Sequence, residues 1–235
     1  AGALTPETLT HQVRRELGTL RAQPPRRFSH APRPRRSAQV RVWKKDTEQV
    51  HLCAGTYALP RTHPDRFALE LLHVLLGANM SSRLFREVRE KRGLVYEVST
   101  HIKRFYDTGA FVVSAGCDAG KLAATVQTIF RELGRVGKGP ISHAELTRAK
   151  DYYAGQLLMG LEDTMDQMLW MGEQVVTVGR VAKPDALLAH IAKVAERDIR
   201  RVARALFGTP RMHLAGVGPI GEPETRRLTE LCRIQ

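Results

Sequence analysis

Apolar and polar residues alternate in two neighbouring segments, and this pattern constrains the fold of the chain more than any other feature. Residues 39–45 and 50–58 each alternate with a period of two, which predicts two β-strands with one buried face. A further strand pair is predicted over residues 96–103 and 109–117, around a turn at residues 107–109. Strands that are joined by short turns pair antiparallel. These segments therefore predict an antiparallel sheet.

Helical spacing of apolar residues dominates the rest of the chain. Residues 64–76 are predicted to form a helix, because apolar residues such as Leu71 and Leu75 recur on one side of it. Ser142 and Glu145 have the spacing of a capping box at the start of another helix. The other predicted elements are helices over residues 81–92, 122–133, 164–178, 184–194, 197–207 and 222–232, and a strand over residues 211–217. This order predicts an α+β fold in which helices pack on one face of the antiparallel sheet.

The first 38 residues do not follow this pattern. Residues 1–20 hold one predicted helix, which begins after Thr5 with a proline at its first position. Residues 21–38 contain four prolines among arginines, a composition typical of a linker. We therefore interpret residues 1–20 as the tail of a preceding domain, residues 21–38 as a Pro/Arg-rich linker and residues 39–235 as one α+β domain.

The formal net charge of +13 is concentrated near this linker. Nine basic residues and no acidic residue lie between Arg21 and Lys45. A basic segment can bind nucleic acid or another anionic surface, but only Phe28 and Trp43 are available there to stack on bases. A hinge between two domains explains the segment more simply. The apolar runs are also too short to span a bilayer, so we expect neither a nucleic-acid partner nor a membrane partner.

The cysteines and histidines do not form a metal-binding pattern. The three cysteines lie far apart and include no Cys-x-x-Cys, so neither a disulfide framework nor a cysteine zinc site is predicted. None of the nine histidines belongs to a His-Glu-x-x-His motif or to its inverted form, His-x-x-Glu-His. We therefore expect that this chain binds no metal and no other cofactor by itself.

One arginine of the helix predicted over residues 81–92 has no acidic residue at ion-pair spacing. Arg83 and Arg86 each precede a glutamate by four residues, the spacing of ordinary surface pairs. Arg89 has no such acid, so its guanidinium is available to bind a peptide carbonyl or a carboxylate. The alternative is a solvated surface arginine, and the spacing alone leaves both interpretations open.

Tyr96 is the second candidate for a functional residue. It starts the strand predicted over residues 96–103 and is expected to share a face with Val98, Thr100 and Ile102. A tyrosine at this position can be a half-buried packing residue. Alternatively, its hydroxyl can donate a hydrogen bond to a developing oxyanion at the mouth of the strand. The strand pattern does not decide between these roles.

Two sequence strings carry a resemblance to a known family. Residues 76–85, LGANMSSRLF, and residues 89–96, REKRGLVY, resemble the pitrilysin and mitochondrial processing peptidase family of zinc peptidases. Together these two strings are specific, whereas either alone is less so. The resemblance covers roughly residues 40–220, and its weaker matches lie at residues 48–52, 63–69 and 162–180.

The resemblance implies a fold and a division of labour. Members of this family are built from two similar α/β halves that enclose a chamber. The first half holds zinc through an inverted His-x-x-Glu-His motif and a distal glutamate, and the second half supplies an arginine and a tyrosine that face the zinc. Arg89 and Tyr96 match that pair by their position in the motif. Residues 1–20 resemble the last helix of the preceding half.

By this resemblance, the chain is the C-terminal, non-metal half of a zinc metallopeptidase. It would contribute substrate-binding and oxyanion-stabilising residues to an active site whose zinc lies in a partner half, and it would be inactive alone. The expected partners are a catalytic half-domain or subunit of the same family, the latter forming a dimer, and a peptide or protein substrate. The alternative is a catalytically inactive structural or interaction subunit of the same family. The presence of both Arg89 and Tyr96 argues against that alternative.

Overall fold

A computed structural model of the chain describes all residues except 1, 22, 25–27, 33–36, 209–211 and 235. Five strands form one sheet in the order β1-β5-β2-β4-β3. The strands are β1 (Val40–Lys44), β2 (Val50–Ala58), β3 (Glu97–Arg104), β4 (Gly109–Cys117) and β5 (His213–Gly218). Strands β5, β2, β4 and β3 pair antiparallel, as predicted, whereas β1 pairs parallel with β5. The two strands of this parallel pair are far apart in the sequence. The periodicity of each strand does not indicate the direction in which they pair.

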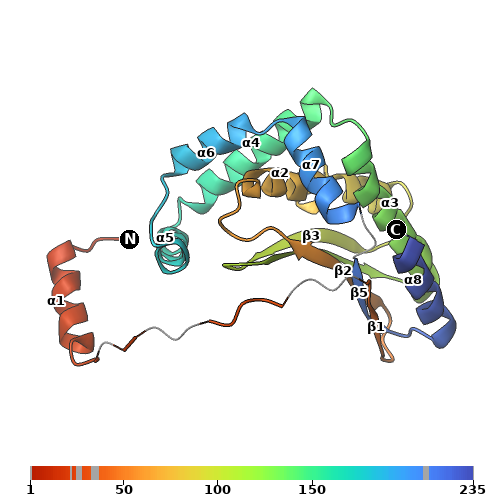
Figure 1. The fold of residues 1–235 in the computed structure, drawn as a ribbon, viewed down its shortest axis with the longest axis horizontal. Helices are drawn as coiled ribbons and strands as arrows, with labels where there is room; N and C mark the ends of the chain where they lie inside the picture. Colours follow the sequence, from red (N-terminus) through yellow and green to blue (C-terminus); the bar gives the residue numbers. More distant parts are fainter. Residues whose placement is uncertain (1, 22, 25–27, 33–36, 209–211, 235) are drawn as a thin grey trace.

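Helices cover one face of this sheet, which confirms the predicted fold class (Figure 1). Two short helical elements lie between the longer ones. The π-helix η1 (Phe85–Glu90) follows helix α2 (Arg66–Gly77), and the 3₁₀-helix η2 (Ala119–Lys121) follows β4. The α-helices are α1 (Pro6–Leu17), α2 (Arg66–Gly77), α3 (Leu122–Lys138), α4 (His143–Gly160), α5 (Thr164–Val178), α6 (Pro184–Lys193), α7 (Glu196–Phe207) and α8 (Glu222–Ile234). Among the helices that the structure describes, none is long and apolar enough to cross a membrane.

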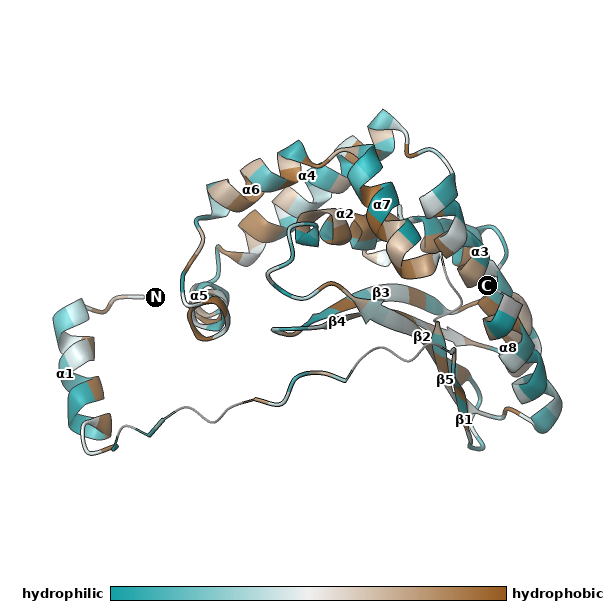
Figure 2. Cartoon of the chain, in the orientation of Figure 1, coloured by the Kyte–Doolittle hydropathy of each residue, from teal (hydrophilic) through white to brown (hydrophobic). Residues whose placement is uncertain are grey.

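The hydrophobic core lies between the sheet and the helices. Leu52 of β2 and Phe111 of β4 are buried because alternate residues of each strand face the helices. Helix α2 is the most apolar helix of this layer, and Figure 2 shows its hydrophobic residues directly above the sheet. Each fully buried leucine or phenylalanine contributes about 1.5–3 kcal/mol through removal of its apolar surface from water. Burial of this face therefore fixes which side of each strand points outward.

Helix α2 approaches β3 so closely that only glycine fits at the contact. A Cβ atom on Gly77 would lie 2.8 Å from the backbone nitrogen of Thr100 and 2.6 Å from its Cγ2 atom. The side chain of His73, one turn earlier on α2, also bonds to Thr100, with 2.7 Å between Nδ1 and Oγ1. The centre of β3 is therefore held against α2 by backbone packing and by a polar contact.

The opposite face of the sheet carries small and polar side chains. The strand register aligns Cys53 of β2 with Ser114 of β4 and with Ala215 of β5. A groove of about 540 Å³ runs along this face near the β3–β4 turn, and Tyr57 and His213 are among its lining residues. This open face contrasts with the helix-covered face.

The first segment of the chain stands apart from the sheet (Figure 1). Helix α1 forms as predicted, with Thr5 as its N-cap, and it buries none of its residues. The described part of the predicted linker contacts the β3–β4 turn, where the Ala31 amide donates to Asp107 at 2.8 Å and the Phe28 ring lies 5.2 Å from that of Tyr106. Residues 22, 25–27 and 33–36 of this linker lie outside the described residues, and the division into a tail, a linker and a domain stays a prediction.

Candidate functional site

The segment that carries Arg89 and Tyr96 is a short helix followed by a glycine turn. The predicted helix over residues 81–92 is instead the π-helix η1, in which the Lys91 amide donates to the Arg86 carbonyl at 2.9 Å. No side chain caps it. Gly93 ends the turn with a φ of +56°, a left-handed conformation that favours glycine. The wide π-turn is the kind of irregularity that often occurs at functional sites.

Arg89 is exposed on η1. Its guanidinium lies over the Phe85 ring, with 4.9 Å from Cζ to the ring centroid. Among the described residues no carboxylate forms an ion pair with Arg89, as its spacing predicts. Stacking on an aromatic ring leaves the donors of the guanidinium free at its edge. Arg89 can therefore bind an acceptor that another molecule brings.

The neighbouring arginines differ from the predicted surface pairs, because among the described residues Arg86 forms no ion pair with Glu90 and Arg83 pairs with another acid. Arg83 binds Glu145 of α4 through two hydrogen bonds of 2.6 and 2.7 Å, which raise the pKa of Arg83. Because a bidentate pair with a guanidinium is stronger than a bond to one amide, Glu145 does not complete the predicted capping box. Glu87, the predicted partner of Arg83, instead pairs with Lys91.

Tyr96 lies immediately before β3, at the edge of the sheet. Its amide donates to the Gly116 carbonyl at 2.8 Å, but its side chain is 53% exposed. Val98 and Thr100, with which Tyr96 was predicted to share a face, are buried, so the exposed Tyr96 side chain does not join their packing. Pairing begins at Glu97, so alternation along β3 does not fix the side chain of the preceding residue.

The Tyr96 hydroxyl donates a hydrogen bond to Asp118 at 2.7 Å. This bond raises the pKa of Tyr96 and lowers the pKa of Asp118, because the ionised carboxylate accepts the hydrogen bond of the neutral hydroxyl. Lys121 holds the same carboxylate with 3.3 Å between Nζ and Oδ2, and it also donates to the Gly93 carbonyl at 3.1 Å. Asp118 thus orients the tyrosine hydroxyl, which is a hydrogen-bond donor at neutral pH.

Sequence reasoning missed Asp118 and Lys121. They follow β4, and they come next to Tyr96 only because β3 and β4 pair in the register that aligns Glu97 with Gly116. The spacing of an acid and a base three residues apart was the only local signal, and it is common on protein surfaces. The structure does not join Arg89 and Tyr96 to each other by a hydrogen bond; both lie exposed on either side of Gly93.

The site offers no set of metal ligands. In the part of the chain that the structure describes, no group of three or more histidine, cysteine, aspartate or glutamate residues is placed to hold a metal ion. Catalytic zinc normally has three protein ligands, so the residues around Tyr96 do not fit a zinc centre. What they provide is a hydroxyl donor, an unpaired guanidinium and one lysine.

Comparison with known proteins identifies relatives of the whole fold. Residues 1–153 match the family model described as the peptidase M16 inactive domain. An uncharacterized zinc protease of Streptomyces coelicolor is 37% identical over 194 residues, which cover 83% of this chain and 42% of the relative. An uncharacterized zinc protease of Bacillus subtilis is 33% identical over 178 residues, which cover 76% of this chain and 43% of the relative. The chain thus spans about two-fifths of the length of the curated relatives it matches.

Solved structures show the same fold. A protease from Helicobacter pylori superimposes with a TM-score of 0.80 at 21% identity, over 92% of this chain and 53% of that structure. A peptidase M16 inactive domain from Pseudomonas fluorescens gives a TM-score of 0.79 at 21% identity, over 93% of this chain and 52% of that structure. Both matches cover about half of the longer structure.

Proposed function

Because the chain belongs to the peptidase M16 family as its inactive domain, we propose that it completes the active site of a zinc peptidase whose metal-binding half is a different domain or subunit. In this proposal Tyr96 and Arg89 face a peptide that is enclosed between the two halves. The observation that carries the proposal is the exposed Tyr96 hydroxyl, which is a hydrogen-bond donor at the edge of the sheet and is held there by Asp118.

Tyr96 would act on the carbonyl oxygen of the scissile peptide bond. Negative charge develops on this oxygen during hydrolysis, and a hydroxyl aimed at it stabilises the transition state. The hydroxyl would turn from Asp118 to the oxyanion, and the released carboxylate would stay ionised, as a free aspartate is at neutral pH. Because Lys121 also holds Asp118, the carboxylate stays in place to receive the hydroxyl again after each turnover.

Arg89 would hold the substrate backbone. Its guanidinium has donors free for a peptide carbonyl, and stacking on Phe85 limits its motion. Its positive charge would also favour the developing oxyanion. Arg89 is therefore expected to affect both substrate binding and turnover.

A metal-binding half must come from outside the residues that the structure describes. The curated relatives, named zinc proteases, are more than twice as long as the matched segment, which leaves room in them for a second half. Zinc, a catalytic partner half and a peptide substrate are thus parts of the proposal. The residues described here contribute positioning and hydrogen bonding only.

A structural role is the second candidate. It is favoured by the Tyr96–Asp118 bond itself, since a tyrosine that only ties β3 to the end of β4 would make the same contact. A scaffold subunit would need neither a free Arg89 nor an exposed hydroxyl.

The two roles are separated by an assay of this chain assembled with a metal-binding half of the same family. Tyr96→Phe keeps the ring and removes only the donor, so we expect kcat to fall by roughly 10²–10³ with an unchanged melting temperature. Arg86→Ala, at an exposed arginine of η1, is the control and is expected to keep near-normal activity. Equal activity of Tyr96→Phe and Arg86→Ala would overturn the catalytic role and favour the scaffold.

A further inference from the structure

A cavity of about 280 Å³ lies at the far end of β3 from Tyr96. Its walls come from α2, α4, α5, α6, the loop before α2 and the α5–α6 loop, and from Arg104 at the end of β3. We call it the arginine pocket, because four arginines line it: Arg61, Arg66, Arg104 and Arg180. Seven residue steps along β3, at about 3.3 Å each, separate it from the start of the strand by roughly 23 Å. It is thus distinct from the Tyr96 site.

Positive charge exceeds negative charge in the arginine pocket. Only two carboxylates line it, those of Glu70 and Glu173. Glu70 pairs with Arg104, and Glu173 pairs with Arg61 at 2.7 Å. Within the described parts of the chain, no carboxylate forms an ion pair with Arg66 or Arg180. Two guanidinium groups therefore remain without a counter-charge.

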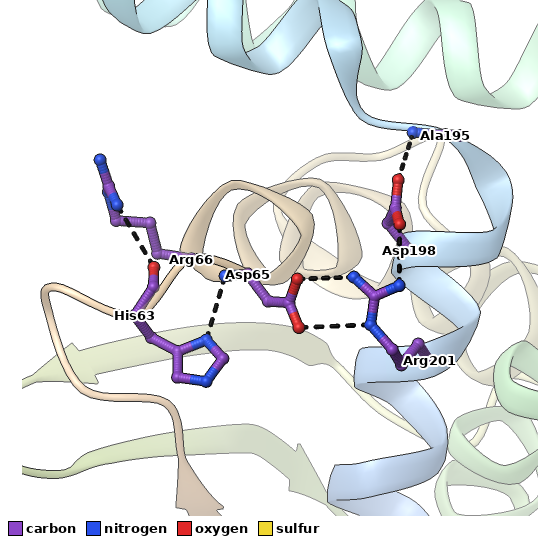
Figure 3. Close-up of polar contacts among 6 residues, drawn as sticks. All are labelled: His63, Asp65, Arg66, Ala195, Asp198 and Arg201. Carbon is purple, nitrogen blue, oxygen red and sulfur yellow. Dashed lines mark hydrogen bonds and ion pairs between the residues drawn. The ribbon is translucent and has the colours of Figure 1, made fainter.

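Arg66 lacks a partner because the acid beside it is already bound elsewhere. Asp65 accepts two hydrogen bonds from Arg201 of α7, at 2.6 and 3.3 Å, and Asp198 braces the same arginine at 2.9 Å. Figure 3 shows the Arg66 side chain pointing away from this pair. Arg66 instead donates to the His63 carbonyl at 3.3 Å and lies over the ring of Phe67, which leaves most of its donors unused.

Two groups of the pocket, Arg104 and Tyr153, are poorly solvated, whereas Arg180 is exposed. Burial lowers the pKa of Arg104, and the positive charges of Arg61 and Arg66 also lower it, while Tyr153 and Glu173 oppose the shift. Burial also raises the pKa of Tyr153. Charges interact more strongly where water is scarce, so an anion that enters the pocket would relieve repulsion among these guanidinium groups.

The remaining lining is apolar, with one unused amide donor. Phe67, Leu157 and Trp170 supply apolar wall. The side-chain oxygen of Gln174 accepts a hydrogen bond from the Ala182 amide at 2.9 Å, which orients the amide group. Its Nε2 atom is buried and has no hydrogen-bond partner among the described atoms. A buried donor without an acceptor is costly unless a ligand satisfies it.

We propose that the arginine pocket binds a carboxylate that is carried by an apolar group, such as the C-terminal residue of a peptide. The carboxylate would accept hydrogen bonds from Arg66 and Gln174, and the apolar group would pack on Trp170 and Leu157. A carboxylate fits the planar fork of an arginine, and the cavity volume suits one residue rather than a folded domain. This inference does not depend on the peptidase role of Tyr96, because the pocket is formed by this chain alone.

Binding to the purified chain tests the proposal directly. The probe is N-acetyl-phenylalanine, its neutral control is N-acetyl-phenylalanine amide, and inorganic phosphate tests for a simple anion site. Calorimetric titration gives the affinities. Trp170 lines the pocket and the second tryptophan, Trp43, is exposed on β1, so the fluorescence of a Trp43→Phe variant reports on the pocket.

We expect saturable binding of the acid. The amide should bind roughly tenfold or more weakly, because it loses one charge-assisted hydrogen bond. Arg66→Gln is expected to lower the affinity for the acid by a similar factor, whereas Arg86→Gln on η1 leaves that affinity unchanged. Equal affinity for acid and amide, no binding of the acid, or equal binding of phosphate and acid would each overturn the assignment. A melting curve for each variant establishes that it is folded.

Discussion

The two ends of β3 hold their charged groups in opposite ways. Before its start, Tyr96 and Asp118 bond to each other at the surface, with Lys121 beside them. At its end, Arg104 is mostly buried against Glu70. Water screens charges at the first site and is scarce at the second. At one end of the strand, a hydrogen-bonding group interacts strongly only when a partner excludes water from it. At the other end, the positive potential of the pocket is present in the chain by itself.

The difference separates residues that need an assembly from residues that do not. An oxyanion donor is effective in a site from which water is excluded, so Tyr96 requires the enclosing half proposed above. The arginine pocket is walled by helices of this chain and needs no other subunit. In the isolated chain, substitutions at the pocket and in the middle of β3 should therefore change the free energy of unfolding, whereas substitutions at the Tyr96 end should hardly change it.

The largest expected effect concerns His73, which holds the middle of β3 through Thr100. Burial, and then the positive charge of His101, lower the pKa of His73 to about 4 from 6.5. Between these values the unfolded chain binds more protons than the folded chain, so stability is present near neutral pH and is lost as the pH falls from about 6.5 to 4. The loss is at most about 3.4 kcal/mol for this shift.

Urea unfolding between pH 7 and pH 4.5 measures this effect. His73→Gln cannot be protonated and is expected to show a smaller decrease in unfolding free energy over that range. His51→Gln, at an exposed histidine on the open sheet face, is the control. An identical pH dependence of His73→Gln and the native chain would show that His73 is protonated without cost.

The second prediction compares the two ends of the strand directly. Glu70→Ala leaves Arg104 mostly buried without its carboxylate and next to the charge of Arg61, so we expect a loss of about 1–3 kcal/mol in unfolding free energy. Alanine keeps the helix propensity of α2. Asp118→Ala removes the corresponding acid at the exposed end and is expected to leave the urea midpoint almost unchanged. Equal losses for both variants would remove the contrast between buried and screened charges.

The fold could be predicted to the extent that it depends on local periodicity. Strands β2, β3 and β4 and helices α2 and α3 form close to the expected residues, because alternation and helical spacing decide which face is buried. The parallel pairing of β1 with β5 could not be predicted, because it depends on a contact between the two ends of the domain.

The candidate site was predicted less completely. The sequence shows that Arg89 has no acidic residue at ion-pair spacing. It does not show the partner of Arg83, which lies 62 residues away on α4. Asp118 was missed because only the β3–β4 register brings it to Tyr96. The arginine pocket combines residues from five helices and strands and from two loops, and no spacing rule connects Arg66 with Arg180.

The smallest expected effect is a change in ionisation at the Tyr96 end. The hydrogen bond to Asp118, and then its negative charge, raise the pKa of Tyr96. Asp118→Asn removes the charge and keeps a side chain of the same shape, so the pKa of Tyr96 should fall toward that of a free tyrosine. NMR titration of ring-labelled tyrosine resolves Tyr96, with Tyr96→Phe used to assign its signal and with the exposed Tyr106 as an internal control. Because both groups lie in solvent, the melting temperature should stay constant while the pKa moves. A Tyr96 pKa that is unchanged in Asp118→Asn would mean that the carboxylate does not hold the hydroxyl proton in solution, and the proposed exchange between Asp118 and an oxyanion would lose its starting state.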